Sequence, residues 1–131
     1  MRQRVAFFSV VPSPYQRDLF RALAKCPEVD LRVFYQENAS PDSPWPEKPL
    51  EPFESVLPGR WFRCGTARVH WNWGLPNLGA YDVTVLNVLV PSITGQWLMR
   101  SKLRGKPWVY WGEKLGGGGA VKRWISAPLN R

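Results

Sequence analysis

The chain has 131 residues, which suits one domain and is too short for two ordinary ones. Its apolar fraction of 44% is typical of a globular protein, and no run approaches the roughly 20 apolar residues of a membrane-spanning helix. Cys26, Cys64 and the single histidine, His70, lack the spacing of a zinc site, so we expect unpaired thiols in a reducing compartment, with a disulfide as the alternative. The net charge of +8 indicates an anionic partner, such as nucleic acid, a phospholipid surface or an acidic substrate, or else a basic surface without a specific role.

Residues 4–24 predict a strand, a tight loop and a helix. The nearly unbroken apolar run over residues 5–11 is typical of a strand buried on both faces of a parallel sheet. Ser13 then stands where a helix N-cap belongs, Pro14 takes the first helical position, and Gln16 completes the pattern of a capping box. The apolar stripe of this helix consists of Leu19, Phe20 and Leu23.

Three later segments predict further strands, at residues 30–36, 81–90 and 107–111, because apolar, aromatic and β-branched residues dominate them. We expect the last of the three to be buried. A proline-rich stretch, residues 40–59, predicts a long surface loop, with a short strand or hairpin near residues 54–56 and 61–63.

A second helix is expected between the last two strands. Ser92 or Thr94 can cap it, and Gly105 and Pro107 favour its end near Arg104. The alternation of strands and helices predicts an α/β fold with a Rossmann-like parallel sheet and flanking helices. Right-handed crossovers then bring the loops after residues 11, 90 and 111 to one edge of the sheet, where ligands bind in such folds.

Two of these loops carry the candidate chemistry. The start of the first helix can face a substrate hydroxyl or phosphate, although a capped helix start without a further role is the alternative. Glu113 follows the last strand and can orient a hydroxyl or accept its proton, which makes it the candidate catalytic residue, with a solvated surface glutamate as the alternative. A polar-aromatic cluster around His70, which we expect in a loop, suits the face of a sugar, with an incidental loop histidine as the alternative. The candidate substrate-binding residues are Ser13, Tyr15, Gln16, His70, Asn72, Asn87 and Gly112.

Four segments of the chain resemble, in the right order, the N-terminal domain of family 4 glycosyltransferases of the GT-B type. They read RVAFFSVVPSPYQRDLFRALA, DLRVFYQ, YDVTVLNV and LRGKPWVYWGEKLG. The family opens with a strand, a loop of the PSPYQ kind and a helix of the DLFxALA kind, and later has a YDV-type strand and an RGKP strand that ends in a WGE-like turn. The resemblance covers nearly all of the chain.

The resemblance implies a Rossmann-like, acceptor-binding part of a two-domain enzyme that moves a sugar from a nucleotide sugar to an acceptor hydroxyl, usually with retention of configuration. Residues 1–131 would then be a truncated N-terminal domain, inactive without the donor-binding C-terminal domain. The nucleotide sugar is a co-substrate, and we expect no metal or other cofactor. Two features depart from the family: PSPYQ replaces its glycine-rich first loop, and Gly112 and Glu113 occupy the region where some members carry a histidine.

The expected partner is a glycan or a lipid-linked acceptor at the cytoplasmic face of a membrane, as in several relatives. Arg100, Lys102, Arg104 and Lys106 form a basic helix end that can meet anionic lipid, with a solvated helix end as the alternative. A basic aromatic module that binds glycan or nucleic acid without catalysis is the second functional hypothesis. No nucleic-acid-binding motif supports a specific nucleic acid, and a decayed gene product without activity is the third possibility.

Overall fold

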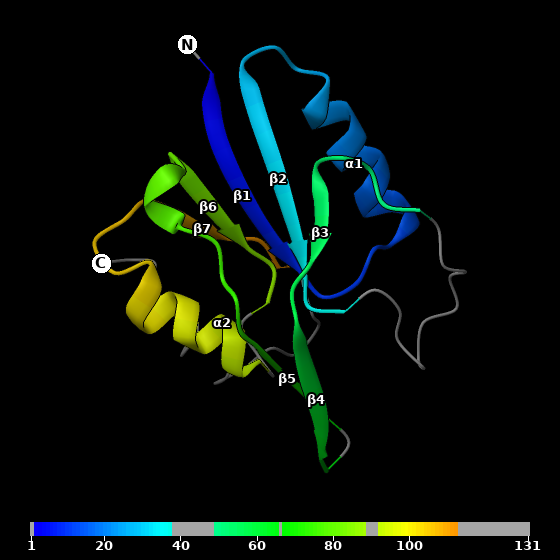
Figure 1. Ribbon diagram of the computed structural model, residues 1–131, viewed down its shortest axis with the longest axis vertical. Helices are drawn as coiled ribbons and strands as arrows, with labels where there is room; N and C mark the ends of the chain where they lie inside the picture. Colours follow the sequence, from blue (N-terminus) through cyan, green and yellow to red (C-terminus); the bar gives the residue numbers. More distant parts are fainter. Residues whose placement is uncertain (1, 38–48, 66, 89–91, 113–131) are drawn as a thin grey trace.

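The computed structural model describes residues 2–37, 49–65, 67–88 and 92–112. Its centre is a five-stranded parallel sheet with the strand order β3-β2-β1-β6-β7. Helix α1 packs on one face of the sheet, and α2 with its continuation η2 packs on the other (Figure 1). The predicted α/β fold with a parallel sheet flanked by helices is confirmed, and the arrangement is compatible with a Rossmann-like fold. The sheet strands are β1 (Gln3–Ser9), β2 (Val29–Tyr35), β3 (Glu54–Val56), β6 (Val83–Leu86) and β7 (Trp108–Tyr110).

The helices begin and end close to where the sequence predicts. Helix α1 spans Pro14–Ala24, with Ser13 at its N-cap. Helix α2 spans Ile93–Trp97 and continues as a π-helical turn, η2 (Leu98–Lys102), while a short 3-10 turn, η1 (Leu78–Ala80), precedes β6. Ser92 caps α2 through its hydroxyl, which accepts a hydrogen bond of 2.9 Å from the backbone N–H of Gly95. Within the described residues, no helix is long and apolar enough to cross a membrane.

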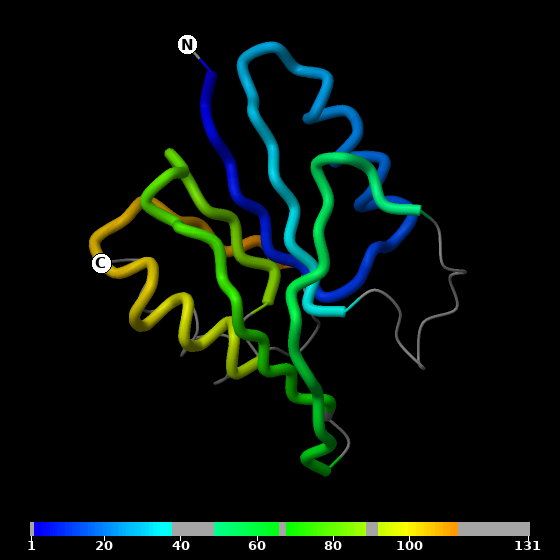
Figure 2. The backbone as a smooth tube through the Cα atoms, viewed as in Figure 1, coloured from blue at the N-terminus to red at the C-terminus, as the bar shows by residue number. Residues whose placement is uncertain are grey.

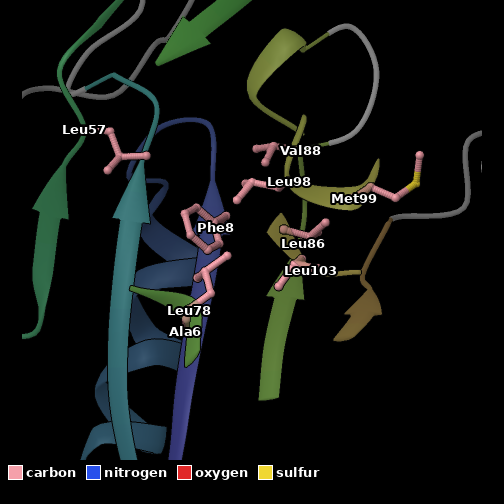
Figure 3. Close-up of a cluster of buried hydrophobic side chains, with 9 residues drawn as sticks. All are labelled: Ala6, Phe8, Leu57, Leu78, Leu86, Val88, Leu98, Met99 and Leu103. Atoms are coloured by element: carbon pink, nitrogen blue, oxygen red, sulfur yellow. The ribbon is translucent and has the colours of Figure 1, made fainter. Parts of the chain in front are cut away.

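Strand β1 is buried on both faces, as its continuous apolar run predicts, because it is the central strand of the sheet. Ala6 and Phe8 point into a cluster on the α2 side, while Phe7 points into a cluster on the α1 side. Figure 3 shows the first cluster, in which side chains from the sheet, the connecting loops and η2 meet. This cluster consists of Ala6, Phe8, Leu57, Leu78, Leu86, Val88, Leu98, Met99 and Leu103.

The order of the strands reverses beside β1. The chain runs from β1 through α1 to β2 and β3 on one side, then crosses to β6 and β7 on the other. The parallel strands therefore end at one edge of the sheet, and the reversal lies between β1 and β6. Crevices at such a reversal, outside the carboxyl ends of the strands, are the usual ligand sites of open α/β sheets.

A separate antiparallel hairpin projects beyond this edge (Figure 2). It consists of β4 (Gly59–Cys64) and β5 (Ala67–Asn72), and Gly65 in its turn has a φ of +66°. Residues 54–56 and 61–63 do form strands, but they belong to different sheets, since β3 joins β2 and β4 pairs with β5. The segment around His70 is thus a strand and not the loop that its surroundings suggest. Residues 38–48 of the predicted proline-rich loop lie outside the described residues.

The prediction that residues 107–111 are buried is wrong. Strand β7 lies at the edge of the sheet, beyond β6, so Val109 and Tyr110 keep a third to a half of their surface exposed. Only Trp108, at the start of the strand, packs against the core as a partly buried side chain. The apolar composition of this segment therefore leaves aromatic surface close to the carboxyl edge.

Candidate functional site at the carboxyl edge

The carboxyl ends of β1, β6 and β7 lie side by side at this edge, while residues 89–91 and those after 112, in two of the predicted loops, lie outside the described residues. The backbone N–H of Asn87 donates a hydrogen bond of 2.9 Å to the carbonyl of Phe8, and the N–H of Trp111 donates one of 2.8 Å to the carbonyl of Leu86. The ring of Trp111 packs edge-on against Phe7, with ring centres 5.5 Å apart. Asn87 and Trp111 are therefore held beside the end of the central strand, and Gly112 directly follows Trp111 in the chain.

The start of α1 differs from the predicted capping box. Ser13 has the extended backbone of an N-cap, and its carbonyl accepts a 2.9 Å bond from the N–H of Arg17. Its hydroxyl, however, makes no capping bond, and Gln16 turns the other way to accept a 3.0 Å bond from the hydroxyl of Ser9. The predicted capping box is wrong because the buried hydroxyl of Ser9, at the end of β1, binds the Gln16 side chain that would have completed it.

Two side-chain oxygens at this edge are buried without a hydrogen-bond partner among the described residues, Oε1 of Gln36 after β2 and Oγ of Ser13. Of the two, only Ser13 lies at the start of a helix. The residue is only 5% exposed, and its Oγ has no hydrogen-bond partner among the described residues. A buried hydroxyl without a partner costs free energy, about 1–3 kcal/mol for an unsatisfied group. At the start of an eleven-residue helix, whose positive end attracts negative charge, such a hydroxyl suits an oxygen-rich ligand. Tyr15, in the same first turn, is well exposed.

Partly exposed aromatic rings border the same edge. Trp111 follows β7 with 43% of its surface exposed, and Tyr110 precedes it. A Cβ at Gly112 would collide with the phenol of Tyr110, so a side chain there would require that exposed ring to shift. Neither Tyr110 nor Trp111 was among the candidate site residues, although the aromatic run before Gly112 was the signal that could have found them. Exposed indole and phenol faces at a polar edge are suited to stacking on a sugar ring.

His70 and Asn72 do not join this surface. Asn72 is 1% exposed, and its amide donates a 2.9 Å bond to the carbonyl of Gln36 and accepts a 3.0 Å bond from the hydroxyl of Thr94. The same hydroxyl accepts a 2.6 Å bond from the N–H of Asn72, so this residue fastens β5 to the end of β2 and the start of α2. Gln36 also donates a 2.6 Å bond to the hydroxyl of Ser92. The polar groups of Asn72 are thus occupied within the fold.

A buried ionic cluster surrounds His70. Its Nε2 lies 3.1 Å from Oε1 of Glu37, and the guanidinium of Arg68 reaches both oxygens of the same carboxylate at 2.7 and 2.8 Å. The Nε2 contact is close enough for an ion pair but does not have the direction of a hydrogen bond. Arg68 and His70 hold strand β5 of the hairpin against Glu37, which follows β2, and this is a structural function.

A second buried ion pair joins α1 to the sheet. The guanidinium of Arg17 donates to both oxygens of Glu54, at 3.0 and 2.7 Å, and the phenol of Tyr35 donates a short bond to one of them. Burial alone would raise the pKa of Glu54, but the hydrogen bonds from Arg17 and Tyr35 outweigh it and hold that pKa below its usual value. Burial and the hydrogen bond to Glu54 raise the pKa of Tyr35. Sequence reasoning missed this cluster because its members are far apart in the chain.

Glu113, the candidate catalytic residue, lies outside the described residues, as do Lys114 and the glycine run at 116–119. Arg100, Lys102 and Arg104 are exposed around η2, and Lys102 lies over the ring of Trp97 at 5.1 Å. In the part of the chain that the structure describes, no three His, Cys, Asp or Glu residues gather into a potential metal site. Cys26 and Cys64 are both free thiols.

Comparison of the chain with protein-family models, with curated proteins and with solved structures finds no match. The geometry of the carboxyl edge therefore carries the functional argument.

Proposed function

We propose that this chain is the acceptor-binding part of a glycosyltransferase, with the site at the carboxyl edge of its parallel sheet. The observation that carries the proposal is the hydroxyl of Ser13, buried and without a partner at the start of α1. A sugar hydroxyl or a phosphate oxygen would satisfy this group once the side chains that cover it from water move aside. The resemblance of residues 4–24 to the opening of family 4 glycosyltransferases gives the same segment an acceptor role.

The remaining groups of the edge suit the same class of ligand. Trp111 offers a partly exposed indole face for the apolar side of a sugar ring, and Tyr15 lies exposed in the first turn of α1. Gln16 is held by Ser9, so its amide nitrogen keeps a fixed direction. Hydroxyl, amide and aromatic groups are the ones by which proteins fix small polar ligands.

In this proposal the nucleotide sugar is the co-substrate and the other half of a GT-B enzyme holds it. The described residues contribute acceptor binding, and Glu113, if it acts, would accept the proton of the acceptor hydroxyl. We accordingly expect residues 1–131 alone to transfer no sugar. Detectable transfer by the purified chain would contradict this division of labour.

The proposal is tested by measuring the affinity of the chain for saccharides. Tryptophan fluorescence, titrated with methyl hexosides and hexose phosphates, should detect saturable binding because Trp111 borders the site. Ser13→Ala should weaken the best ligand by about tenfold, the effect of one lost hydrogen bond of about 1–1.5 kcal/mol. Ser101→Ala, the same substitution at an exposed position of η2, is the matched control and should change nothing.

An absence of binding to every saccharide, or equal losses in Ser13→Ala and Ser101→Ala, would overturn the proposal. The second functional hypothesis is a basic aromatic module that binds glycan or nucleic acid without catalysis. It predicts instead a strongly salt-dependent complex with an oligonucleotide and no response of that complex to Ser13→Ala.

A further inference from the structure

The β4–β5 hairpin has an unusual distribution of polar and apolar side chains. In an antiparallel pair, directly opposite residues lie on one face, and successive residues alternate between faces. One face of the hairpin is turned into the protein by His70 and Asn72, which are buried. Its three pairs of opposite residues are Gly59 with Asn72, Trp61 with His70 and Arg63 with Arg68. The polar residues of β5 are therefore the buried ones.

The opposite face, which we call the outward face, is apolar apart from Arg60. It carries Phe62 opposite Val69 and Arg60 opposite Trp71, and Cys64 lies beside the turn. Phe62 is 49% exposed and Trp71 is 52% exposed, and Trp73 packs edge-on against Trp71 with ring centres 6.0 Å apart. A solvent-facing apolar surface that backs onto a buried polar one reverses the usual pattern of a surface hairpin.

The charge around this surface is of one sign. Between Glu54 and Asp82 the chain has no acidic residue, and its charged residues there are Arg60, Arg63 and Arg68. Arg68 is neutralised by Glu37, whereas Arg60 and Arg63 lie exposed along the hairpin. The outward face is thus an apolar surface bordered by cations. Such a surface is complementary to a partner with an apolar interior and an anionic boundary.

We propose that the outward face of the β4–β5 hairpin docks on an anionic lipid bilayer. Indole rings favour the headgroup level of a membrane, where Trp71 and Trp73 would lie, while Phe62 reaches the acyl boundary. Arg60, on the outward face, and Arg63, which belongs to the opposite face but is exposed beside the turn, would pair with lipid phosphates at the border of the docked surface. Because the hairpin projects beyond the rest of the described chain, it can reach such a surface without displacing the sheet (Figure 2). This proposal does not depend on the reaction that the chain serves.

The size of the outward face argues against a second protein. Six residues per strand span about 20 Å and two strands are about 10 Å wide, which gives an area on the order of 200 Å². A stable protein interface buries about 800 Å² on each partner. A bilayer needs no such complementary area, since it deforms around the side chains that enter it.

The hairpin also fits nucleic acid poorly. The guanidinium of Arg68 lies 4.1 Å from the ring centre of Trp61, and that of Arg63 lies 5.9 Å from it, so this ring is already stacked on cations of its own chain. Only Arg60 and Arg63 remain for phosphates, whereas tight nucleic-acid binding uses several cations. Base stacking on Trp71 is hindered by Trp73, whose ring stands at 77° to it.

Vesicle sedimentation of the full 131-residue chain tests the proposal. We expect binding to phosphatidylcholine vesicles that contain phosphatidylglycerol, and weaker binding to phosphatidylcholine alone or at high salt. Phe62→Ser with Trp71→Ser should reduce the partition coefficient more than about tenfold, because both side chains leave water on docking. Val109→Ser on β7, where the exposure of 49% equals that of Phe62, is the matched control and should leave partition unchanged.

Charge variants keep the test independent of the apolar substitutions. Arg60→Gln with Arg63→Gln should weaken binding to anionic vesicles by about 25-fold, about fivefold for each charge near the surface. The matched control, Arg100→Gln with Lys102→Gln, removes two exposed cations from η2 and so distinguishes the hairpin from the basic helix end as the binding surface. Because η2 lies outside the proposed docking face, the partition coefficient should change less than about twofold. Circular dichroism and urea unfolding confirm that each variant is folded.

Several results would overturn the proposal. These are an absence of binding to anionic vesicles, equal losses in the hairpin and η2 variants, and full binding by the Phe62 and Trp71 variant. A complex with an oligonucleotide that only the hairpin variants weaken would identify nucleic acid as the partner instead. Self-association in sedimentation that the same variants abolish would identify a second copy of the chain.

Discussion

The buried pair of Arg17 and Glu54 predicts a large and specific loss of stability. Glu54 accepts four hydrogen bonds, two from Arg17, one from Tyr35 and one from the backbone N–H of Glu51. Both side chains of the pair are at most 5% exposed. Glu54→Gln keeps the shape of the side chain but removes its charge and turns an N–H₂ group toward groups that also donate. Arg17 would then be a buried charge without a carboxylate.

The size of the loss follows from the desolvation of Arg17. Removing one partner of a buried ion pair costs about 3–5 kcal/mol. With a urea dependence of about 2 kcal/mol per molar, the unfolding midpoint should fall by about 1.5–2.5 M. Because small domains are stable by only about 5–15 kcal/mol, this is a large part of the total free energy of unfolding.

Urea unfolding followed by tryptophan fluorescence measures the change directly. Glu51→Gln is the matched control, since Glu51 pairs with Arg21 on the partly exposed surface, where a salt bridge contributes about 0–1 kcal/mol. Adding Arg17→Met to Glu54→Gln should restore part of the loss, because the unpaired charge is gone. The reasoning would be refuted by a midpoint for Glu54→Gln that equals that of Glu51→Gln.

Three further predictions concern the same fold. The pKa of Glu54 lies below its ordinary value of 4.5. The stability that its charge contributes should therefore be complete above pH 4.5 and should fall as the pH drops through the folded-state pKa. Urea midpoints measured across this pH range should fall less for Glu54→Gln than for the unmodified chain. Asn72→Ala removes bonds to Gln36 and Thr94 and should lower the free energy of unfolding by about 2–4 kcal/mol in a thermal melt, whereas an unchanged melting temperature would contradict the role of Asn72 as a fastener. Gly59→Ala brings a Cβ within 2.5 Å of the amide of Asn72 and should lower the free energy of unfolding by about 1–3 kcal/mol through overpacking. Circular dichroism and urea unfolding measure this loss. An unchanged free energy of unfolding would mean that the hairpin shifts freely.

Local sequence signals predict the central part of the fold well. The continuous apolar run of β1, the proline at the start of α1 and the glycine with φ of +75° after η2 each act within a few residues. Their physical cause is the backbone geometry and burial of the segment itself. The parallel sheet follows from the alternation of such strands with helices, because the crossover helices cover both of its faces.

Long-range contacts decide what the sequence does not predict. Gln16 has the spacing of a capping box, yet Ser9 at the end of β1 binds its side chain, and no local rule weighs that competition. Arg17 looks like an exposed helical cation until β3 brings Glu54 against it, and Asn72 looks like a ligand until Thr94 and Gln36 bind it. In each case a buried partner far along the chain determines what the side chain does.

The hairpin shows a different limit. Strand β5 alternates, but its polar His70 and Asn72 face inward and its apolar Val69 and Trp71 face outward. The usual rule that apolar side chains mark the core therefore assigns the wrong face of this strand. Among the candidate site residues, the ones that the structure leaves at the carboxyl edge are those that follow the strands of the main sheet. His70 and Asn72, on the hairpin, are used to hold it in place.

Residue-resolved NMR of the ¹⁵N-labelled chain, titrated with the saccharide that fluorescence shows to bind best, tests the proposed acceptor site most directly. The account predicts that the shifted amide signals cluster at Ser13, Tyr15 and Gln16 and at Asn87, Trp111 and Gly112, while the hairpin signals stay unchanged. Signals that shift only on the hairpin, or nowhere at saturating saccharide, would contradict an acceptor site at the carboxyl edge of the sheet.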